Sequence, residues 1–123
     1  MTEWQDNQPI FRQLADKIME QILQGVWQED SALPSVRMVA AELKINHLTV
    51  MKGYQLLVDE GLVEKRRGQG MYVAKGALEQ LKQRQKQHFL QQQLPAIAHT
   101  LSVLEMPLDD FISQLKRHIE GEQ

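Results

Sequence analysis

The segment from Leu33 to Val50, with the sequence LPSVRMVAAELKINHLTV, constrains the fold more than any other part of the chain. Ser35 follows a proline and belongs to a residue type that caps helices, and an amphipathic run comes directly after it. A short polar turn then leads to Asn46, a second capping residue, and to a second helical run. Two short helices joined by a tight turn predict a helix-turn-helix.

The spacing of apolar residues assigns a buried and an exposed face to both helices, which we place over about 35–44 and 47–60. The positions predicted to point inward are Val36, Val39, Ala40, Leu43, Val50, Tyr54 and Leu57, with Ile45 buried in the turn. The positions left on the outer face of the second helix are His47, Leu48, Met51, Lys52 and Gln55. Gly61 ends this helix.

A β-hairpin is predicted next, with strands over 62–66 and 71–74. Between them Arg67-Gly68-Gln69-Gly70 supplies turn residues, since glycine tolerates positive φ. Upstream, we expect a loose arm over residues 1–8 and a helix that Pro9 opens and Gly25 ends. Three helices and a hairpin predict a winged helix-turn-helix domain over residues 1–75.

A second, helical module is predicted over residues 76–123, with Pro95 kinking or restarting one helix and Pro107 opening the last. About 48 residues lie near the lower limit for independent folding, so two antiparallel helices here cannot bury their apolar faces alone. A second copy of the chain is the simplest partner, which predicts a homodimer. The expected dimer interface comprises Leu90, Leu94, Ile97, Leu101, Leu104, Phe111, Ile112, Leu115 and Ile119. The fold class is therefore mainly α with a small β-hairpin.

Charge restricts how such a protein could contact nucleic acid. The net charge of the chain is −2, and residues 1–75 contain nine Lys and Arg against ten Asp and Glu. A protein that binds DNA without regard to sequence would carry a basic excess. Any DNA contact must therefore use a local patch, and Lys65-Arg66-Arg67 is the one tight basic cluster in the sequence.

Three motifs in this order resemble the GntR family of bacterial transcription regulators. They are LPSVR, the Asn46-to-Val50 element NHLTV, and the hairpin RGQGMYV. The resemblance covers Pro9 to Val73, and the short helical tail is similar to that of the YtrA-like subfamily. Two departures stand out: His47-Leu48 replaces the arginine or proline and polar residue usual there, and Gly53 stands where alanine is usual.

The resemblance implies a sequence-specific regulator that binds a palindromic double-stranded DNA operator as a homodimer. We expect this regulator to be a repressor. It implies that Arg37 reaches DNA from the helix before the recognition helix, that residues 46–49 read bases, and that the hairpin enters the minor groove. The DNA-binding residues expected on this basis, together with the basic cluster, are Ser35, Arg37, Asn46, His47, Leu48, Thr49, Lys52, Lys65, Arg66, Arg67, Gly68 and Gln69. Leu48 cannot form a hydrogen bond and would contact a thymine methyl group.

Each of these residues also has a purely structural interpretation. Arg37 could pair with Glu42, Asn46 could only cap its helix, and the basic cluster could be a solvated charge run. The competing function is a winged-helix module that contacts proteins and not DNA, which the balanced charge favours.

Other classes of function have little support in the sequence. We predict no enzyme, because no nucleophile–base pair, phosphate-binding loop or dinucleotide fingerprint is present. We expect no cofactor and no metal, since His88, His99 and His118 are scattered. The absence of cysteine and of a long apolar run predicts a cytoplasmic protein with no membrane partner. The resemblance further implies control of a transport operon and a small-molecule effector, whose pocket would lie in or against the helical tail.

Overall fold

The computed structural model describes residues 4–121, and these form two compact units. The first unit extends through Gln83 and the second begins at Arg84. The order of elements is α1 (Ile10–Leu23), α2 (Val36–Leu43), α3 (His47–Asp59), β1 (Val63–Arg66), β2 (Gly70–Val73), α4 (Ala77–His88), η1 (Phe89–Gln93), α5 (Leu94–Val103) and α6 (Leu108–Ile119). Most of the chain is helical and the sheet has two strands, so the predicted fold class is confirmed.

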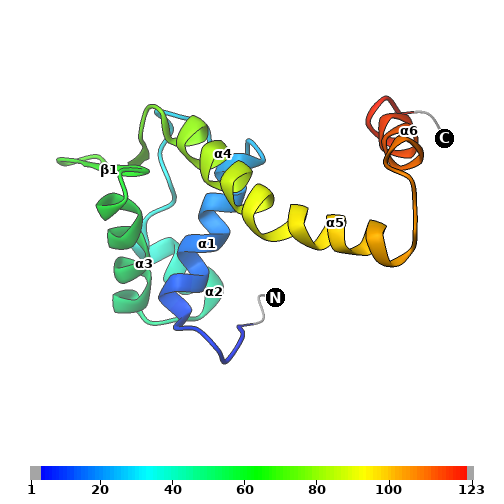
Figure 1. The fold of residues 1–123 in the computed structure, drawn as a ribbon. Coiled ribbons are helices and arrows are strands. Elements are labelled where there is room, and N and C mark those ends of the chain that lie inside the picture. The colour runs from blue at the N-terminus through cyan, green and yellow to red at the C-terminus, as the bar shows by residue number, and fades with distance from the viewer. Residues whose placement is uncertain (1–3, 122–123) are drawn as a thin grey trace. The chain divides into compact units, whose positions relative to one another are not determined.

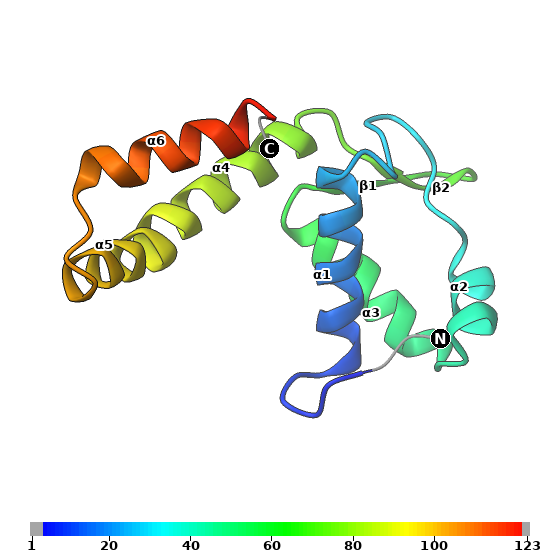
Figure 2. The same ribbon diagram turned by 90° about the vertical axis from the view of Figure 1, so that its right-hand side faces the viewer.

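The first helix, α1, is the scaffold of the first unit and lies beside α3 (Figures 1 and 2). Pro9 is its N-cap, and Gly25 follows its C-terminus with a φ of 85°, as the sequence predicts. Residues 4–8 of the predicted arm are not loose, and residues 1–3 lie outside the described part of the chain. Residues 4–8 fold back on α1, because the Gln13 side chain accepts a hydrogen bond from the Gln5 N–H and donates to the carbonyls of Gln5 and Gln8.

The predicted helix-turn-helix is confirmed in its local chemistry. The Ser35 side chain accepts a hydrogen bond from the Met38 N–H at 3.1 Å, and the Asn46 side chain accepts one from the Leu48 N–H at 2.7 Å. Each side chain thereby satisfies one backbone donor that a helix start leaves unpaired. Lys44 takes the left-handed conformation, φ 56°, which turns the chain from α2 into α3.

Gly53 accounts for the close approach of α1 and α3. A Cβ atom at this position would lie 3.0 Å from the Phe11 carbonyl oxygen and 3.2 Å from a methyl group of Leu14. Glycine in the middle of a helix normally lowers its stability, but here it removes the side chain that would separate the two helices. The departure from the alanine usual in the family therefore has a packing reason.

The two strands pair antiparallel in a register that joins Val63 to Val73 and Arg66 to Gly70. Both strands differ slightly from the predicted bounds: Leu62 is not part of β1, because its N–H donates to the Leu57 carbonyl and closes α3. The segment 30–33 adds a further partner to β2. The Asp30 and Leu33 N–H groups donate to the Val73 and Met71 carbonyls, each at 2.8 Å.

One hydrophobic core fills the first unit. Its buried members come from the three helices, the hairpin, the start of α4 and the segments that lead into α2 and β1: Leu14, Ala15, Ile18, Ile22, Leu33, Val39, Ala40, Val50, Tyr54, Leu57, Leu62, Val63, Val73, Ala77 and Leu81. Ile45, Val36 and Trp27 pack against this core without being fully buried. Because Ala77 and Leu81 belong to it, the compact unit extends past the boundary predicted at residue 75.

The second unit consists of helices without a buried interior. Pro95 lies in the first turn of α5, which begins at Leu94 after the π-helical turn η1, so the predicted restart of the helix is confirmed. The backbone stays helical through this junction, because the Leu94 N–H donates to the Phe89 carbonyl five residues earlier. Pro107 starts α6 as predicted. None of the described residues from Arg84 onward is buried, and the antiparallel pairing predicted for the tail helices stays a prediction. No described helix is long and apolar enough to cross a membrane.

Candidate nucleic-acid interface

The start of α2 presents a free cationic side chain. Arg37 is exposed and makes no hydrogen bond or ion pair with any residue that the structure describes. The ion pair with Glu42, its structural alternative, is not formed. Ser35 lies two residues before Arg37 and caps α2 through its hydroxyl oxygen. The guanidinium of Arg37 is therefore available to an external anion.

The outer face of α3 carries the residues predicted to read bases. His47, Leu48 and Lys52 are exposed, with 63% of Leu48 accessible, whereas Thr49 is half-buried. The Lys52 ammonium lies 6.0 Å from the centre of the Phe11 ring, a weak cation–π distance that leaves it open to solvent. No acidic residue occurs from Ile45 to Val58, so this face would not repel a phosphate backbone.

The tip of the hairpin is compact and polar. The Gln69 N–H donates to the Arg66 carbonyl at 2.8 Å, and Gly68 and Gly70 adopt φ values of 74° and 109° that suit glycine. Lys65, Arg67 and Gln69 are exposed. Between this hairpin, the start of α2 and the outer face of α3 lies a hollow of about 380 Å³, whose walls include Ser35, Met51, Gln55, Lys65 and Gln69.

The geometry thus brings together residues from three separate elements. Three of the predicted DNA-binding residues line the hollow: Ser35, which caps α2, and Lys65 and Gln69 of the hairpin. Arg37, His47, Leu48 and Lys52 are exposed but do not line it. Met51 and Gln55 also line the hollow, although the sequence-based set omits both. Helical spacing places both on the outer face with Leu48, because positions three and seven residues apart share a face, but neither matches a family motif.

Arg66 differs from the other members of the predicted set. Its guanidinium donates to Glu64 and Asp30 and lies over the ring of Tyr72. The pKa of Arg66 is raised above its ordinary value, and the hydrogen bond with Glu64 is the largest cause. Nothing in the local sequence could have indicated Asp30 as a partner, since it lies 36 residues away.

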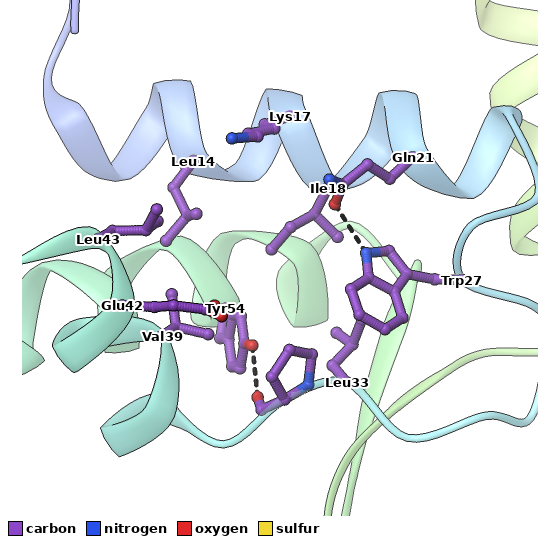
Figure 3. Close-up of a pocket in the computed structure, with 11 residues that line it drawn as sticks. Leu14, Lys17, Ile18, Gln21, Trp27, Leu33, Val39, Glu42, Leu43 and Tyr54 are labelled. Carbon is purple, nitrogen blue, oxygen red and sulfur yellow. Dashed lines mark hydrogen bonds between the residues drawn. The ribbon is translucent and has the colours of Figure 1, made fainter. Parts of the chain in front are cut away.

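A tyrosine of α3 fixes the turn that precedes α2. The hydroxyl of Tyr54 donates to the Pro34 carbonyl at 2.6 Å, and the side chain is 1% exposed (Figure 3). This bond lies at the edge of a cavity of about 120 Å³ with mainly apolar walls from Leu14, Ile18 and Trp27. The Trp27 ring N–H donates to the Gln21 side chain at 2.7 Å in the same view.

Neither a metal site nor a titratable catalytic group accompanies this surface. The described residues contain no cluster of three or more His, Asp or Glu side chains that could hold a metal ion. Burial raises the pKa of Tyr54 to about 12, so its hydroxyl stays a donor in alkaline solution as well as at neutral pH. The arrangement of exposed cations around the hollow is suited to binding a ligand with negative charge.

The sequence pattern of one protein family, the bacterial regulatory proteins of the gntR family, matches residues 11–73, which are more than half of the 123 residues. The chain belongs to the gntR family. The HTH-type transcriptional repressor YtrA of Bacillus subtilis is 31% identical over 116 residues, which are 92% of this chain and 88% of that protein. As a YtrA-like GntR regulator, the chain is a transcription regulator and not an enzyme.

Solved structures agree with this assignment to the GntR family. A GntR family transcriptional regulator from Listeria monocytogenes superposes with a TM-score of 0.67 at 26% identity, covering 93% of this chain and 98% of that one. The DNA-binding domain of AraR, solved in complex with its operator ORX1, shares the fold with a TM-score of 0.54 at 24% identity, covering 60% of this chain and 90% of that one. The predicted winged helix-turn-helix is confirmed, whereas the individual DNA contacts of this GntR protein stay predictions.

Proposed function

We propose that this protein is a repressor that binds a palindromic DNA operator as a homodimer in the cytoplasm. The observation that carries the proposal is the shared surface formed by the start of α2, the outer face of α3 and the hairpin. α3 enters the major groove and contacts base edges through His47, Leu48 and Thr49, since an α-helix fits that groove. Asn46 caps α3, and the backbone N–H groups at this N-terminus of the helix face a phosphate.

Local charge, and not net charge, supports phosphate binding by this surface. Arg37, Lys52, Lys65 and Arg67 are exposed cations without ion pairs among the described residues. The acidic residues of the first unit lie outside the stretches 43–58 and 65–78. Each cation that neutralises a phosphate releases counterions, so binding is salt-dependent even though the chain is slightly acidic overall. Gly68 lets the hairpin tip approach the sugar–phosphate backbone closely.

The exposed apolar face of the tail supports dimerisation. Leu108 and Leu115 are 62% and 44% exposed, and Phe111 and Ile112 belong to the same face of α6. The other tail residues of the proposed interface are Leu90, Leu94, Ile97, Leu101, Leu104 and Ile119, all exposed or half-buried. Soluble proteins rarely leave such a contiguous apolar surface in water. A second copy covers it with an identical face, as in a two-fold interface.

Dimerisation gives the operator its form. Two recognition helices related by a two-fold axis bind half-sites whose centres lie about 10 base pairs apart, or a multiple of that distance. The relative YtrA of Bacillus subtilis is a transcriptional repressor, which supports repression as the outcome. The family resemblance extends the proposal to a transport operon and to a small-molecule effector that would alter operator affinity through the tail.

The alternative function is a winged-helix module that contacts another protein. The balanced charge of the first unit favours it, because residues 1–75 carry no basic excess. The free cations at the start of α2 and on the hairpin oppose it. Salt distinguishes the two, since counterion release makes DNA affinity fall steeply as salt rises.

Selection of bound fragments from the source genome tests the proposal. The full chain is incubated with sheared DNA, and retained fragments are sequenced and confirmed by fluorescence anisotropy on short duplexes. We expect a shared inverted repeat that binds at least about a hundredfold more tightly than the same bases scrambled. Retention of fragments with no common sequence would contradict sequence-specific operator binding.

A further inference from the structure

The two faces of the hairpin carry different chemistry. Successive side chains of a strand point to opposite faces, so Lys65 and Arg66 lie on different sides of β1. Lys65 lines the hollow that opens toward α3, together with its cross-strand partner Met71. Arg66 lies on the other face with Glu64 and Tyr72, which form the neighbouring cross-strand pair. The adjacent basic residues of the cluster are therefore not equivalent.

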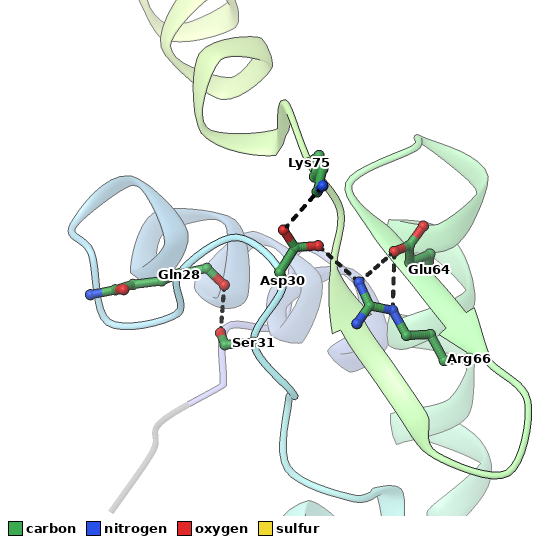
Figure 4. A network of polar contacts seen from close by, with 6 residues as sticks. All are labelled: Gln28, Asp30, Ser31, Glu64, Arg66 and Lys75. Atoms are coloured by element: carbon green, nitrogen blue, oxygen red, sulfur yellow. Dashed lines mark hydrogen bonds and ion pairs between the residues drawn. The ribbon is translucent and has the colours of Figure 1, made fainter.

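Arg66 is held by three groups at once, and Figure 4 shows two of them, the carboxylates of Asp30 and Glu64. One terminal nitrogen donates to Asp30 at 2.9 Å and to Glu64 at 2.8 Å, and Nε donates to Glu64 at 3.2 Å. The guanidinium carbon lies 4.2 Å from the centre of the Tyr72 ring, within the range of a cation–π interaction. Gly70, directly opposite Arg66 in the sheet, offers no side chain that would compete for this space.

The partner Asp30 belongs to the segment that leads into α2. Its N–H donates to the Val73 carbonyl and its second carboxylate oxygen lies 3.9 Å from the Lys75 ammonium. Three residues further on, the Leu33 N–H donates to Met71, and Pro34 and Ser35 then open α2. The Arg66–Asp30 pair thus ties the first strand of the hairpin to the segment that carries Arg37.

We propose that Arg66 is a positioning residue, which fixes the hairpin relative to the start of α2 and does not itself bind DNA. This inference rests on the proposed operator binding and corrects the role assigned to Arg66 on sequence grounds. The two carboxylates offset the guanidinium charge, so the cluster of Arg66, Lys75, Asp30 and Glu64 is neutral. If Arg66 turned to a phosphate, it would leave Asp30 and Glu64 unpaired beside a polyanion.

The substitution Asp30→Asn tests this role, because a positioning role and a phosphate-binding role of Arg66 predict opposite changes in operator affinity. If Arg66 positions the hairpin, the substitution weakens operator binding about threefold or more, although it removes a negative charge near DNA. If Arg66 binds phosphate, the substitution frees it and binding becomes tighter, which would overturn the proposal. Glu42→Gln is the matched control, since Glu42 is an exposed carboxylate on α2 with no ion-pair partner among the described residues.

The double variant Asp30→Asn with Arg66→Ala shows whether Asp30 acts through Arg66. Coupling predicts that Asp30→Asn causes no further loss of operator affinity once Arg66 is absent. An equal loss in both backgrounds would overturn the proposal, since Asp30 would then act through its own backbone. Arg66→Lys keeps the charge but not the paired geometry, so we expect it to bind as weakly as Arg66→Ala.

Three controls separate these outcomes from other failures. Circular dichroism of every variant checks that the first unit is folded. Arg67→Ala, which alters an exposed neighbour without a carboxylate partner among the described residues, should weaken binding in either model. If the unaltered chain binds no selected duplex, the proposed operator function fails, and that result is distinct from a wrong sign for Asp30→Asn.

Discussion

The hydroxyl of Tyr54, in the middle of the recognition helix α3, donates a hydrogen bond of 2.6 Å to the carbonyl of Pro34, in the turn before α2. Pro34 precedes the cap Ser35, and Arg37 follows two residues later. One buried bond therefore fixes the distance between the helix proposed to read bases and the cation proposed to bind beside it. The hairpin is tied to the same segment through Leu33 and Asp30.

Removal of this hydroxyl should lower the stability of the first unit. Tyr54→Phe leaves the Pro34 carbonyl without its donor, and we expect the free energy of unfolding to fall by about 1 to 2 kcal/mol. Urea denaturation followed by circular dichroism measures the change. Tyr72→Phe is the control, because the Tyr72 hydroxyl forms no hydrogen bond with any of the described residues. It should change stability by less than about 0.5 kcal/mol. Equal effects of both substitutions would show that the Pro34 bond contributes nothing.

Stability should also depend on alkaline pH through the same tyrosine. Burial raises the pKa of Tyr54 from 10.0 to about 12, so the folded state holds this proton more tightly than the unfolded chain does. The contribution of this proton to the free energy of unfolding is fully present below pH 10 and is lost as the pH rises toward 12. The free energy of unfolding should fall by about 2 to 3 kcal/mol over this range. Denaturation at several pH values should show the loss in the unaltered chain and a smaller one in Tyr54→Phe. Identical pH profiles would disprove the assignment.

Gly53→Ala should destabilise the protein even though alanine is the better helix former. A Cβ atom here meets the Phe11 carbonyl at 3.0 Å, a backbone group that cannot rotate away. We expect the cost of separating α1 from α3 to exceed the gain in helix propensity, for a net loss of about 1 kcal/mol. Thermal unfolding measures the net change in stability. A raised melting temperature would contradict the prediction, because it would show that α1 shifts to make room for the methyl group at little cost.

Arg37→Ala should impair operator binding without affecting the fold. The side chain is exposed and has no partner among the described residues, so its removal leaves stability within about 0.5 kcal/mol of the original. If Arg37 contacts a base or phosphate, specific affinity falls about tenfold or more. Anisotropy titration of the selected duplex gives the result, and unchanged affinity would exclude a DNA contact by Arg37.

Charged residues on the apolar face of the tail should produce a monomer. Leu101→Glu with Leu115→Glu places two negative charges in the proposed interface. In a two-fold dimer, these charges would face the same two charges of the second copy and repel them. Sedimentation velocity should show half the mass of the unaltered chain. Ser102→Glu with Ser113→Glu adds the same charge at exposed polar positions and should leave the dimer intact. A dimer that survives the leucine substitutions would place the interface elsewhere.

The local elements of the first unit could be predicted because their signals are local. Ser35 and Asn46 are caps three and two residues from their hydrogen-bond partners, and Gly25 and Gly61 mark helix ends by conformation. The links between elements could not be predicted in this way. Tyr54 reads as a core residue, and its bond to Pro34 spans 20 positions. Arg66 reads as one of three adjacent cations until the fold brings Asp30 to it.

The stoichiometry and salt dependence of the operator complex test the central claim most directly. Sedimentation equilibrium of the full chain with a selected palindromic duplex, repeated from about 50 to 200 mM salt, reports the number of chains bound and the affinity together. Two chains per duplex, with an affinity that falls at least about a hundredfold over this range, is the result we predict. One chain per duplex, or an affinity indifferent to salt, would contradict a dimeric repressor that uses Arg37, Lys52, Lys65 and Arg67 on phosphates.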